Sequence, residues 1–153
     1  MTKISVIIPA YNSAATLLDT ITAIQNQQYL KDSFEIIVVD DGSKDGTANL
    51  VKKIPNVKLI SQPNSGPAAA RNNGAKNASG EILVFTDSDT VPHPNWLYEL
   101  IKPFDSYQIM ATTGTYSQIN TQSQLSTFIQ REIELKHKSY GDFILFGGTY
   151  NLA

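Results

Sequence analysis

The 153-residue chain contains no cysteine and few charged residues, and each deficit excludes a class of site. Without cysteine there can be no disulfides, no thiolate zinc sites and no cysteine nucleophiles. Charged residues make up 17% of the chain, and the net charge is −2 with no long block of one sign. A nucleic acid held by a basic face is therefore not an expected partner.

Long apolar runs are also missing. The run at residues 4–8, before Pro9, is too short for a signal peptide or a membrane span. A hydrophobic share of 41% in 153 residues fits one globular domain with a buried core, which we expect to span residues 1–153. We expect no membrane segment in this chain and a cytoplasmic location.

Short apolar runs alternate with helical patterns along most of the chain. The apolar runs predict strands at residues 4–8, 34–39, 57–60 and 82–85. Capping residues and apolar spacing predict helices from residue 12 or 13 to about 27, from 45–47 to near 55, from 64 to about 78, and at 95–101. A further strand is predicted at 109–115 and a further helix at 125–138. Four successive strand–helix units predict an α/β fold, with a mostly parallel sheet and helices on both faces.

Unusual clusters follow three of the predicted strands. They are Pro9-Ala10-Tyr11-Asn12, Asp40-Asp41-Gly42-Ser43 and Asp87-Ser88-Asp89. In a parallel sheet the carboxyl ends of the strands meet at one edge, and ligands bind there. The sequence therefore predicts that the three clusters form one ligand site.

Asp87 and Asp89 stand at i, i+2 spacing directly after a predicted strand. In an extended backbone this spacing points both carboxylates to the same side, where they repel one another unless a cation or a proton intervenes. Oxygen ligands of this kind suit Mg²⁺ or Mn²⁺ rather than zinc or copper. The alternative is that the two aspartates only turn the chain, since Asp, Ser and Pro all favour turns.

Other common ligand loops do not fit the sequence. Residues 9–14 contain no glycine, so the dinucleotide fingerprint is absent after the first predicted strand, and no Walker loop is present. A calcium loop starting at Asp41 would need a glutamate where Lys52 stands. The two histidines, His93 and His137, are not spaced as a metal pair.

One arginine, Arg71, lies among small residues at a predicted helix start. An exposed helix arginine is the simpler interpretation. However, the small residues permit close approach, and the free N–H groups of a helix start favour an anion. A metal ion, an arginine and a helix N-terminus together would suit a diphosphate.

Four segments follow one another along the chain: residues 6–12 (VIIPAYN), 36–47 (IIVVDDGSKDGT), 64–74 (NSGPAAARNNG) and 80–89 (GEILVFTDSD). Together, and in this order, they resemble the inverting glycosyltransferases of family 2, which have the GT-A fold. The resemblance implies transfer of a sugar, with inversion, from a nucleotide-diphosphate sugar to an acceptor hydroxyl. It also implies a divalent metal cofactor, Mn²⁺ or Mg²⁺, with a UDP-sugar as the expected donor and polysaccharide biosynthesis as the setting.

The resemblance also carries residue roles to the matching positions. Pro9, Ala10 and Tyr11 would form a wall beside the nucleobase, and Asp40 would accept a hydrogen bond from the base. Arg71 would lie near the nucleobase or the phosphates.

Two further roles concern the acidic stretch. The resemblance implies that Asp87 touches the ribose or a metal-bound water and that Asp89 binds the metal ion directly.

The general base of the family is a carboxylate of a Glu-Asp pair that follows a glycine-containing loop. Residues 146–151 look like that loop, but no Glu-Asp pair occurs in this chain. We therefore expect the base to lie beyond Ala153, the chain to be cut inside the acceptor side, and the fragment itself to be inactive. Apolar residues around 143–146 would then be exposed and favour self-association.

The acceptor, either a carbohydrate or a lipid-linked molecule, cannot be identified from these residues. The parent protein would act in the cytoplasm or at the cytoplasmic face of the membrane. Two alternatives remain open: a non-catalytic fragment that binds nucleotide and metal, and a sugar-nucleotidyltransferase.

Overall fold

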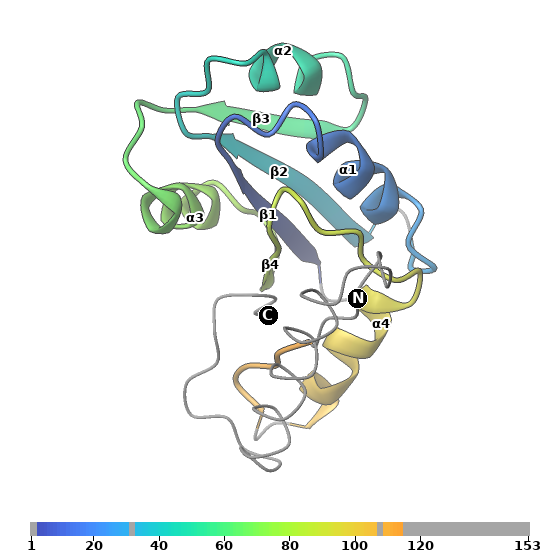
Figure 1. The fold of residues 1–153 in the computed structure, drawn as a ribbon. Helices are drawn as coiled ribbons and strands as arrows, with labels where there is room; N and C mark the ends of the chain where they lie inside the picture. The colour runs from blue at the N-terminus through green and yellow to red at the C-terminus, as the bar shows by residue number, and fades with distance from the viewer. Residues whose placement is uncertain (1–2, 31–32, 107–108, 115–153) are drawn as a thin grey trace, which may run out of the picture.

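The computed structural model describes residues 3–30, 33–106 and 109–114 (Figure 1). Its four strands are β1 (Ile4–Ala10), β2 (Phe34–Asp40), β3 (Val57–Ser61) and β4 (Ile82–Phe85). Its α-helices are α1 (Leu17–Gln25), α2 (Thr47–Val51), α3 (Pro67–Lys76) and α4 (Trp96–Ile101), and a 3₁₀ helix follows at Lys102–Asp105. The strands form one sheet in the order β3-β2-β1-β4, and all three pairings are parallel. The predicted α/β fold with a parallel sheet is confirmed.

Helices cover both faces of the sheet, and Figure 1 shows α1 and α3 on opposite sides of β1 and β2. Along β1 and β2, alternate residues point to opposite faces. One face of the sheet packs against α1, α2 and α4 through a cluster that includes Ile4, Val6, Ile8, Leu17, Ile21, Ile24, Val51 and Leu97. The other face packs against α3 through Ile7, Ile37, Val39 and Ala70. All seven residues of β1 are buried, which is typical of a central parallel strand.

Gly74 lets α3 approach β1 closely. A Cβ atom at this position would collide with the side chain of Ile7 and would press on Val39. Since both of these residues belong to the sheet core, a larger residue at position 74 would push α3 away from the sheet. The position of α3 matters because its first turn borders the cavity described below.

The first strand extends beyond Pro9, where the sequence pattern ends it. β1 pairs with β2 up to Ala10 and Asp40, whereas its pairing with β4 ends at Ile7 and Phe85. The backbone oxygen of Ala10 accepts from the backbone N–H of Asp41, directly after β2, so the backbone of Pro9 faces the side of β4. No β4 residue is paired at that level, and the missing N–H of proline therefore removes no ladder hydrogen bond.

The segment at 109–114 is not the strand that the sequence predicts. It contains a single bridge residue, Thr113, and no strand longer than that. The Thr112 hydroxyl donates to the backbone oxygen of Leu100, so this segment is tied to the end of α4. The predicted helix at 125–138 lies outside the described residues.

The chain order of the strands creates a switch point between β1 and β4. From β1 the chain proceeds outward to β2 and β3, then returns through α3 to β4 on the other side of β1. The direction of the strand order therefore reverses at β1, with β2 on one side of it and β4 on the other. A crevice forms at such a point in open parallel sheets, and ligands bind in it.

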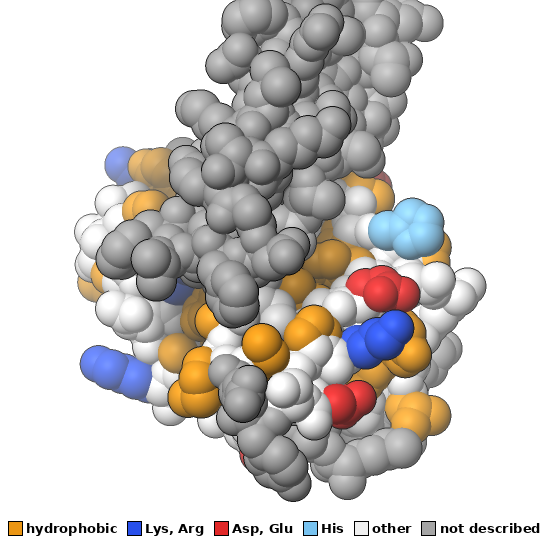
Figure 2. Space-filling view, turned by 90° about the horizontal axis from the view of Figure 1, so that it is seen from below, with side chains coloured by type: hydrophobic (Ala, Val, Ile, Leu, Met, Phe, Trp, Pro, Cys, Tyr) orange, Lys and Arg blue, Asp and Glu red, His pale blue; other side chains and the backbone are white. Residues whose placement is uncertain are grey.

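The surface of the described part has mixed charge. In the face shown in Figure 2, hydrophobic side chains lie beside charged ones, and one basic side chain stands between two acidic ones. Within the described ranges, no helix is long and apolar enough to cross a membrane.

Candidate functional site

A cavity of about 530 Å³ lies at the carboxyl ends of β1, β2 and β4. It is lined by Pro9, Ala10, Tyr11, Asp41, Asn64, Gly66, Pro67, Ala70, Arg71, Asp87, Ser88 and Asp89. The structure thus brings together all the sequence-predicted site residues except Asp40. Of the lining residues to which the sequence assigned no separate role, Asp41 and Ser88 carry the polar groups of most interest.

The loop after β1 is fastened to the loop after β2. Asn12 has a left-handed backbone with a φ of 50°. Its backbone N–H donates to the Ser43 hydroxyl at 2.9 Å, and its side-chain oxygen accepts from the backbone of Lys44 at 2.8 Å. A further bond joins the backbone N–H of Ser13 to the Thr47 hydroxyl at 2.9 Å. These contacts hold the preceding Tyr11, whose side chain is 49% exposed, at the mouth of the cavity.

Asp41 is the buried carboxylate of the cavity, with an exposed fraction of only 3%. Its Oδ1 accepts from the side-chain amide of Gln62 at 2.7 Å and from the backbone N–H of Ser65 at 2.9 Å. Its Oδ2 accepts from the backbone N–H of Gly66 at 2.8 Å. Asp41 thereby fixes the segment that leads into α3, and Asn73 of α3 in turn donates to the oxygen of the Gln62 amide at 2.7 Å.

Asp40 lies on the other face of the sheet. It is 4% exposed, its Oδ1 accepts from the backbone N–H of Ser43 at 3.2 Å, and it is not among the described residues that line the cavity. Even-numbered residues of β2 face α1 and α2, whereas Ile37 and Val39 face α3. Asp41 continues the face of Ile37 and Val39, and this is why it, rather than Asp40, borders the cavity.

The pKa of Asp41 predicts how stability responds to acid. Burial raises the pKa of this carboxyl, but the hydrogen bonds from Gln62, Ser65 and Gly66 outweigh burial and hold the pKa below its usual value. A lowered pKa in the folded state stabilises the protein fully above the unfolded value, about 3.9, and this contribution is lost as the pH falls through the folded pKa. The free energy of unfolding of the wild type minus that of Asp41→Asn should therefore shrink as the pH falls from about 5 to 2. Urea unfolding at several pH values would measure it, and a constant difference would contradict the assignment.

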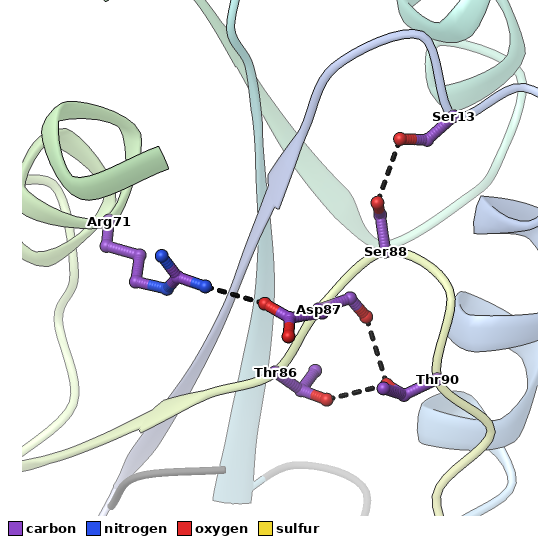
Figure 3. A network of polar contacts seen from close by, with 6 residues as sticks. All are labelled: Ser13, Arg71, Thr86, Asp87, Ser88 and Thr90. Atoms are coloured by element: carbon purple, nitrogen blue, oxygen red, sulfur yellow. Dashed lines mark hydrogen bonds and ion pairs between the residues drawn. The ribbon is translucent and has the colours of Figure 1, made fainter. Parts of the chain in front are cut away.

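The side chain of Arg71 extends from α3 towards Asp87, as Figure 3 shows, and both residues line the cavity. Its Nη2 lies 2.6 Å from Oδ1 of Asp87, and the two side chains are 18% and 33% exposed. The Nε of Arg71 is buried and has no hydrogen-bond partner within the described part of the chain. Arg71 therefore keeps a donor that Asp87 does not satisfy, next to the first turn of α3. Gly66, whose φ of 87° suits glycine, is the N-cap of α3, and Pro67 is the first residue of the helix.

The spacing of the two aspartates suggested an extended backbone, but the structure places neither of them in a strand. β4 ends at Phe85, and Ser88 and Asp89 form a turn. The Thr90 hydroxyl donates to the backbone oxygen of Asp87 at 3.0 Å and closes this turn. Asp87 consequently points towards Arg71, while Asp89 is exposed and makes no hydrogen bond or ion pair with any described residue. We name residues 86–90 the acidic turn.

The residues of the acidic turn fit a hard divalent cation that is bound mainly by waters and substrate phosphates, with one or two protein carboxylates. No group of three or more His, Cys, Asp or Glu side chains that could enclose a metal ion occurs among the described residues. Mg²⁺ and Mn²⁺ do not need one, because they are commonly bound through one or two carboxylates together with waters and substrate phosphates. Asp89 offers such a carboxylate at the edge of the cavity.

Known proteins with similar sequences are glycosyltransferases. The family model for glycosyl transferase family 2 matches residues 5–151. Glycosyltransferase AglE of Haloferax volcanii is 40% identical over 99 residues, which is 61% of this chain and 33% of AglE. The chain thus spans about a third of the length of that relative.

Two solved structures are similar in fold and sequence. Staphylococcus aureus TarS (residues 1–349) in complex with UDP-GlcNAc gives a TM-score of 0.71 at 32% identity and covers 79% of this chain and 36% of TarS. The mannosyltransferase PcManGT from Pyrobaculum calidifontis, in complex with GDP-Man and Mn²⁺, gives 0.71 at 30% identity and covers 75% of this chain and 36% of that protein.

Proposed function

This chain belongs to glycosyl transferase family 2, and we propose that it forms the donor-binding domain of an enzyme that transfers a sugar from a UDP-sugar to an acceptor hydroxyl with inversion. The observation that carries this proposal is the cavity at the β1/β4 switch point. It combines the Tyr11 wall, the buried carboxylate Asp41, Arg71 and the acidic turn within one space. Each of these groups suits a different part of a nucleotide sugar.

The base would lie between the wall of Pro9, Ala10 and Tyr11 and a buried carboxylate. The family resemblance implies that Asp40 supplies this carboxylate, whereas the geometry of the cavity favours Asp41. Either carboxylate would accept a hydrogen bond from N3–H of uracil. Cytosine presents an acceptor at the same atom, so a carboxylate there would face a lone pair and disfavour CDP.

The diphosphate would lie between Arg71, the start of α3 and the acidic turn. The guanidinium and the N–H groups of the first helical turn both favour negative charge. Asp87 would orient Arg71 through their ion pair, and Asp89 would bind the divalent cation. When bound, that cation would act as a Lewis acid towards the leaving diphosphate. The precedent for a nucleotide sugar with Mn²⁺ is PcManGT, and the precedent for a UDP-sugar is TarS.

The acceptor would approach from the open side of the cavity, opposite the diphosphate. Inversion requires attack on the anomeric carbon from the face opposite the leaving group, and in this proposal a carboxylate general base takes the proton of the acceptor hydroxyl. None of the cavity carboxylates is placed for that task in this proposal, since Asp41 is committed to the loop that starts α3 and Asp87 to Arg71. We place the activity in the cytoplasm, at the membrane face if the acceptor is lipid-linked.

Thermal unfolding with ligands tests this function. A ligand that binds only the folded state stabilises it by about 2.7 kcal/mol at a hundredfold excess over Kd. We expect UDP with Mn²⁺ to raise the unfolding temperature more than UDP alone, Mn²⁺ alone, or CDP with Mn²⁺.

The outcomes separate the proposed function from its alternative. A shift with UDP that ignores Mn²⁺ would contradict the metal role, and no shift with any nucleoside diphosphate would contradict the donor site. Mn²⁺-dependent binding of UDP, together with transfer from a panel of UDP-sugars by the longest available form of the protein, would establish the enzyme. Binding without transfer by that form would favour a non-catalytic nucleotide-binding module.

A further inference from the structure

We propose that Ser88, the residue between the two aspartates, is a positioning residue that connects the acidic turn to the Tyr11 wall through Ser13. The inference rests on the proposed function and concerns how the two halves of the donor site are kept in register. Ser88 lies in the cavity wall, and its hydroxyl is 2.8 Å from the hydroxyl of Ser13 in the loop after β1.

The direction of these hydrogen bonds follows from the number of protons. The Ser13 hydroxyl donates its proton to the backbone oxygen of Tyr11 at 3.2 Å. A hydroxyl has one proton, so Ser13 can only accept from Ser88, and Ser88 is the donor of the 2.8 Å bond. The result is a relay in which Ser88 donates to Ser13 and Ser13 donates to the backbone of Tyr11. We call it the serine relay.

The interior of the acidic turn is held separately. The Thr90 hydroxyl donates its proton to the Asp87 backbone oxygen, so the 2.7 Å contact between the Thr86 and Thr90 hydroxyls has Thr86 as its donor. These bonds shape the turn but do not attach it to another element. Loss of the serine relay would therefore leave the turn folded.

Among the described residues, two side-chain contacts attach the acidic turn to the other elements of the site, beyond the backbone hydrogen bond from Thr86 to Ile7 of β1. The two side chains are neighbours in the sequence. Figure 3 shows Asp87 directed towards Arg71 of α3 and Ser88 directed towards Ser13. Asp89 follows and makes no hydrogen bond or ion pair with the described residues. Its position relative to Tyr11 is thus set by the residue before it, through the serine relay.

This arrangement has a consequence for ligand binding. A nucleotide that contacts the Tyr11 wall at one end and the cation at Asp89 at the other needs both at a fixed separation. Without the serine relay the acidic turn stays folded, but its position relative to the Tyr11 wall must be fixed when the ligand binds, and the free energy of fixing it subtracts from the affinity. The gain in UDP affinity that Mn²⁺ provides should fall, whereas the affinity for UDP without Mn²⁺ should change little.

The test compares Ser88→Thr with Ser88→Val, because the two side chains have nearly the same shape and only threonine keeps a hydroxyl. Calorimetry would give the Kd of UDP with and without Mn²⁺, and the ratio of the two is the metal gain. We expect Ser88→Thr to keep the metal gain and Ser88→Val to reduce it about fivefold, the order expected for one hydrogen bond. The Kd without Mn²⁺ should change less than about twofold.

Ser13 supplies an independent variant and a double-mutant cycle. Ser13→Ala should reduce the metal gain as Ser88→Val does, and adding Ser88→Val to Ser13→Ala should have no further effect, because the relay is already broken. Ser33→Ala is the matched control: its hydroxyl also makes a single bond to a backbone oxygen, that of Leu30, but it lies before β2, at the other end of the sheet. That variant should leave the metal gain unchanged.

Three results would overturn the inference alone. They are an equal metal gain in Ser88→Thr and Ser88→Val, additive effects of the Ser13 and Ser88 changes, and a loss in Ser33→Ala of the same size. By contrast, a wild type that shows no Mn²⁺-dependent binding of UDP would overturn the proposed function, and the role of the relay with it.

Discussion

Replacing Asp41 by alanine is expected to lower the free energy of unfolding by about 3 kcal/mol, because it removes the charged acceptor of three part-buried hydrogen bonds, each contributing about 1 kcal/mol. The side-chain amide of Gln62 and the backbone N–H groups of Ser65 and Gly66 all donate to this one carboxylate. Typical domains have about 5–15 kcal/mol of stability, so the loss would be a large fraction of the total. Urea unfolding of the wild type and of Asp41→Ala would measure it.

Asp41→Asn separates the structural role of this residue from its role towards a nucleotide. The amide keeps the shape and can still accept from Gln62 and Ser65, so the stability loss should be smaller, about 1 kcal/mol. However, an amide nitrogen placed where the base would bind can no longer accept from N3–H of uracil. The preference of the wild type for UDP over CDP, about tenfold for one unmatched buried group, should disappear.

Asp40→Asn is the matched comparison, since Asp40 is the neighbouring residue and is equally buried. If Asp41 reads the base, Asp40→Asn should retain the preference for UDP. The reverse outcome, with the preference lost only in Asp40→Asn, would support the role that the sequence resemblance assigns to Asp40. Calorimetry with UDP and CDP on the two variants decides between the carboxylates.

Most of the fold could be predicted because each strand has a recognisable local sequence pattern. Each of the four strands is a short apolar run of a parallel sheet, and turn or capping residues bound it. The end of β1 was harder to predict from the sequence, since proline usually interrupts a central strand. Whether Pro9 interrupts it depends on where β4 stops pairing, and the local sequence of β1 does not contain that information.

The choice between Asp40 and Asp41 shows why the site was predicted less well than the fold. Alternation along β2 assigns the two residues to opposite faces. Yet both faces of β2 are buried by apolar residues, so no amphipathic pattern tells which face meets α3. Only the packing of Ile37 and Val39 against Ala70 identifies it.

The contacts across the cavity also could not be predicted from local sequence patterns. The sequence singles out Arg71 and Asp87 separately, and their ion pair appears only when α3 and the acidic turn are placed together. The same holds for Ser13 and Ser88, which are 75 residues apart in the chain. A signal for Ser88 did exist in its place between two aspartates, but a serine in a turn has a simpler explanation.

Asp89→Asn is expected to abolish the effect of Mn²⁺ on UDP binding while leaving the fold intact. Asp89 is exposed and bonds to no described residue, so its loss removes no internal contact. Even residues that only support metal ligands contribute about 10–100-fold to metal affinity. A direct ligand should contribute at least the upper value, so the Mn²⁺-dependent affinity for UDP should fall by about 100-fold or more.

Asp19→Asn is the control for this variant, because it removes one exposed carboxylate from α1, a helix that does not line the cavity. It makes the same change in net charge, so a general electrostatic effect on Mn²⁺ or UDP would appear in both variants. Calorimetric titration of UDP at several Mn²⁺ concentrations distinguishes the two. If Asp89→Asn kept the wild-type response to Mn²⁺, the cation could not be held by Asp89, and Asp87 would have to leave Arg71 to bind it. That exchange would be visible as a Mn²⁺ response that vanishes in Asp87→Asn instead.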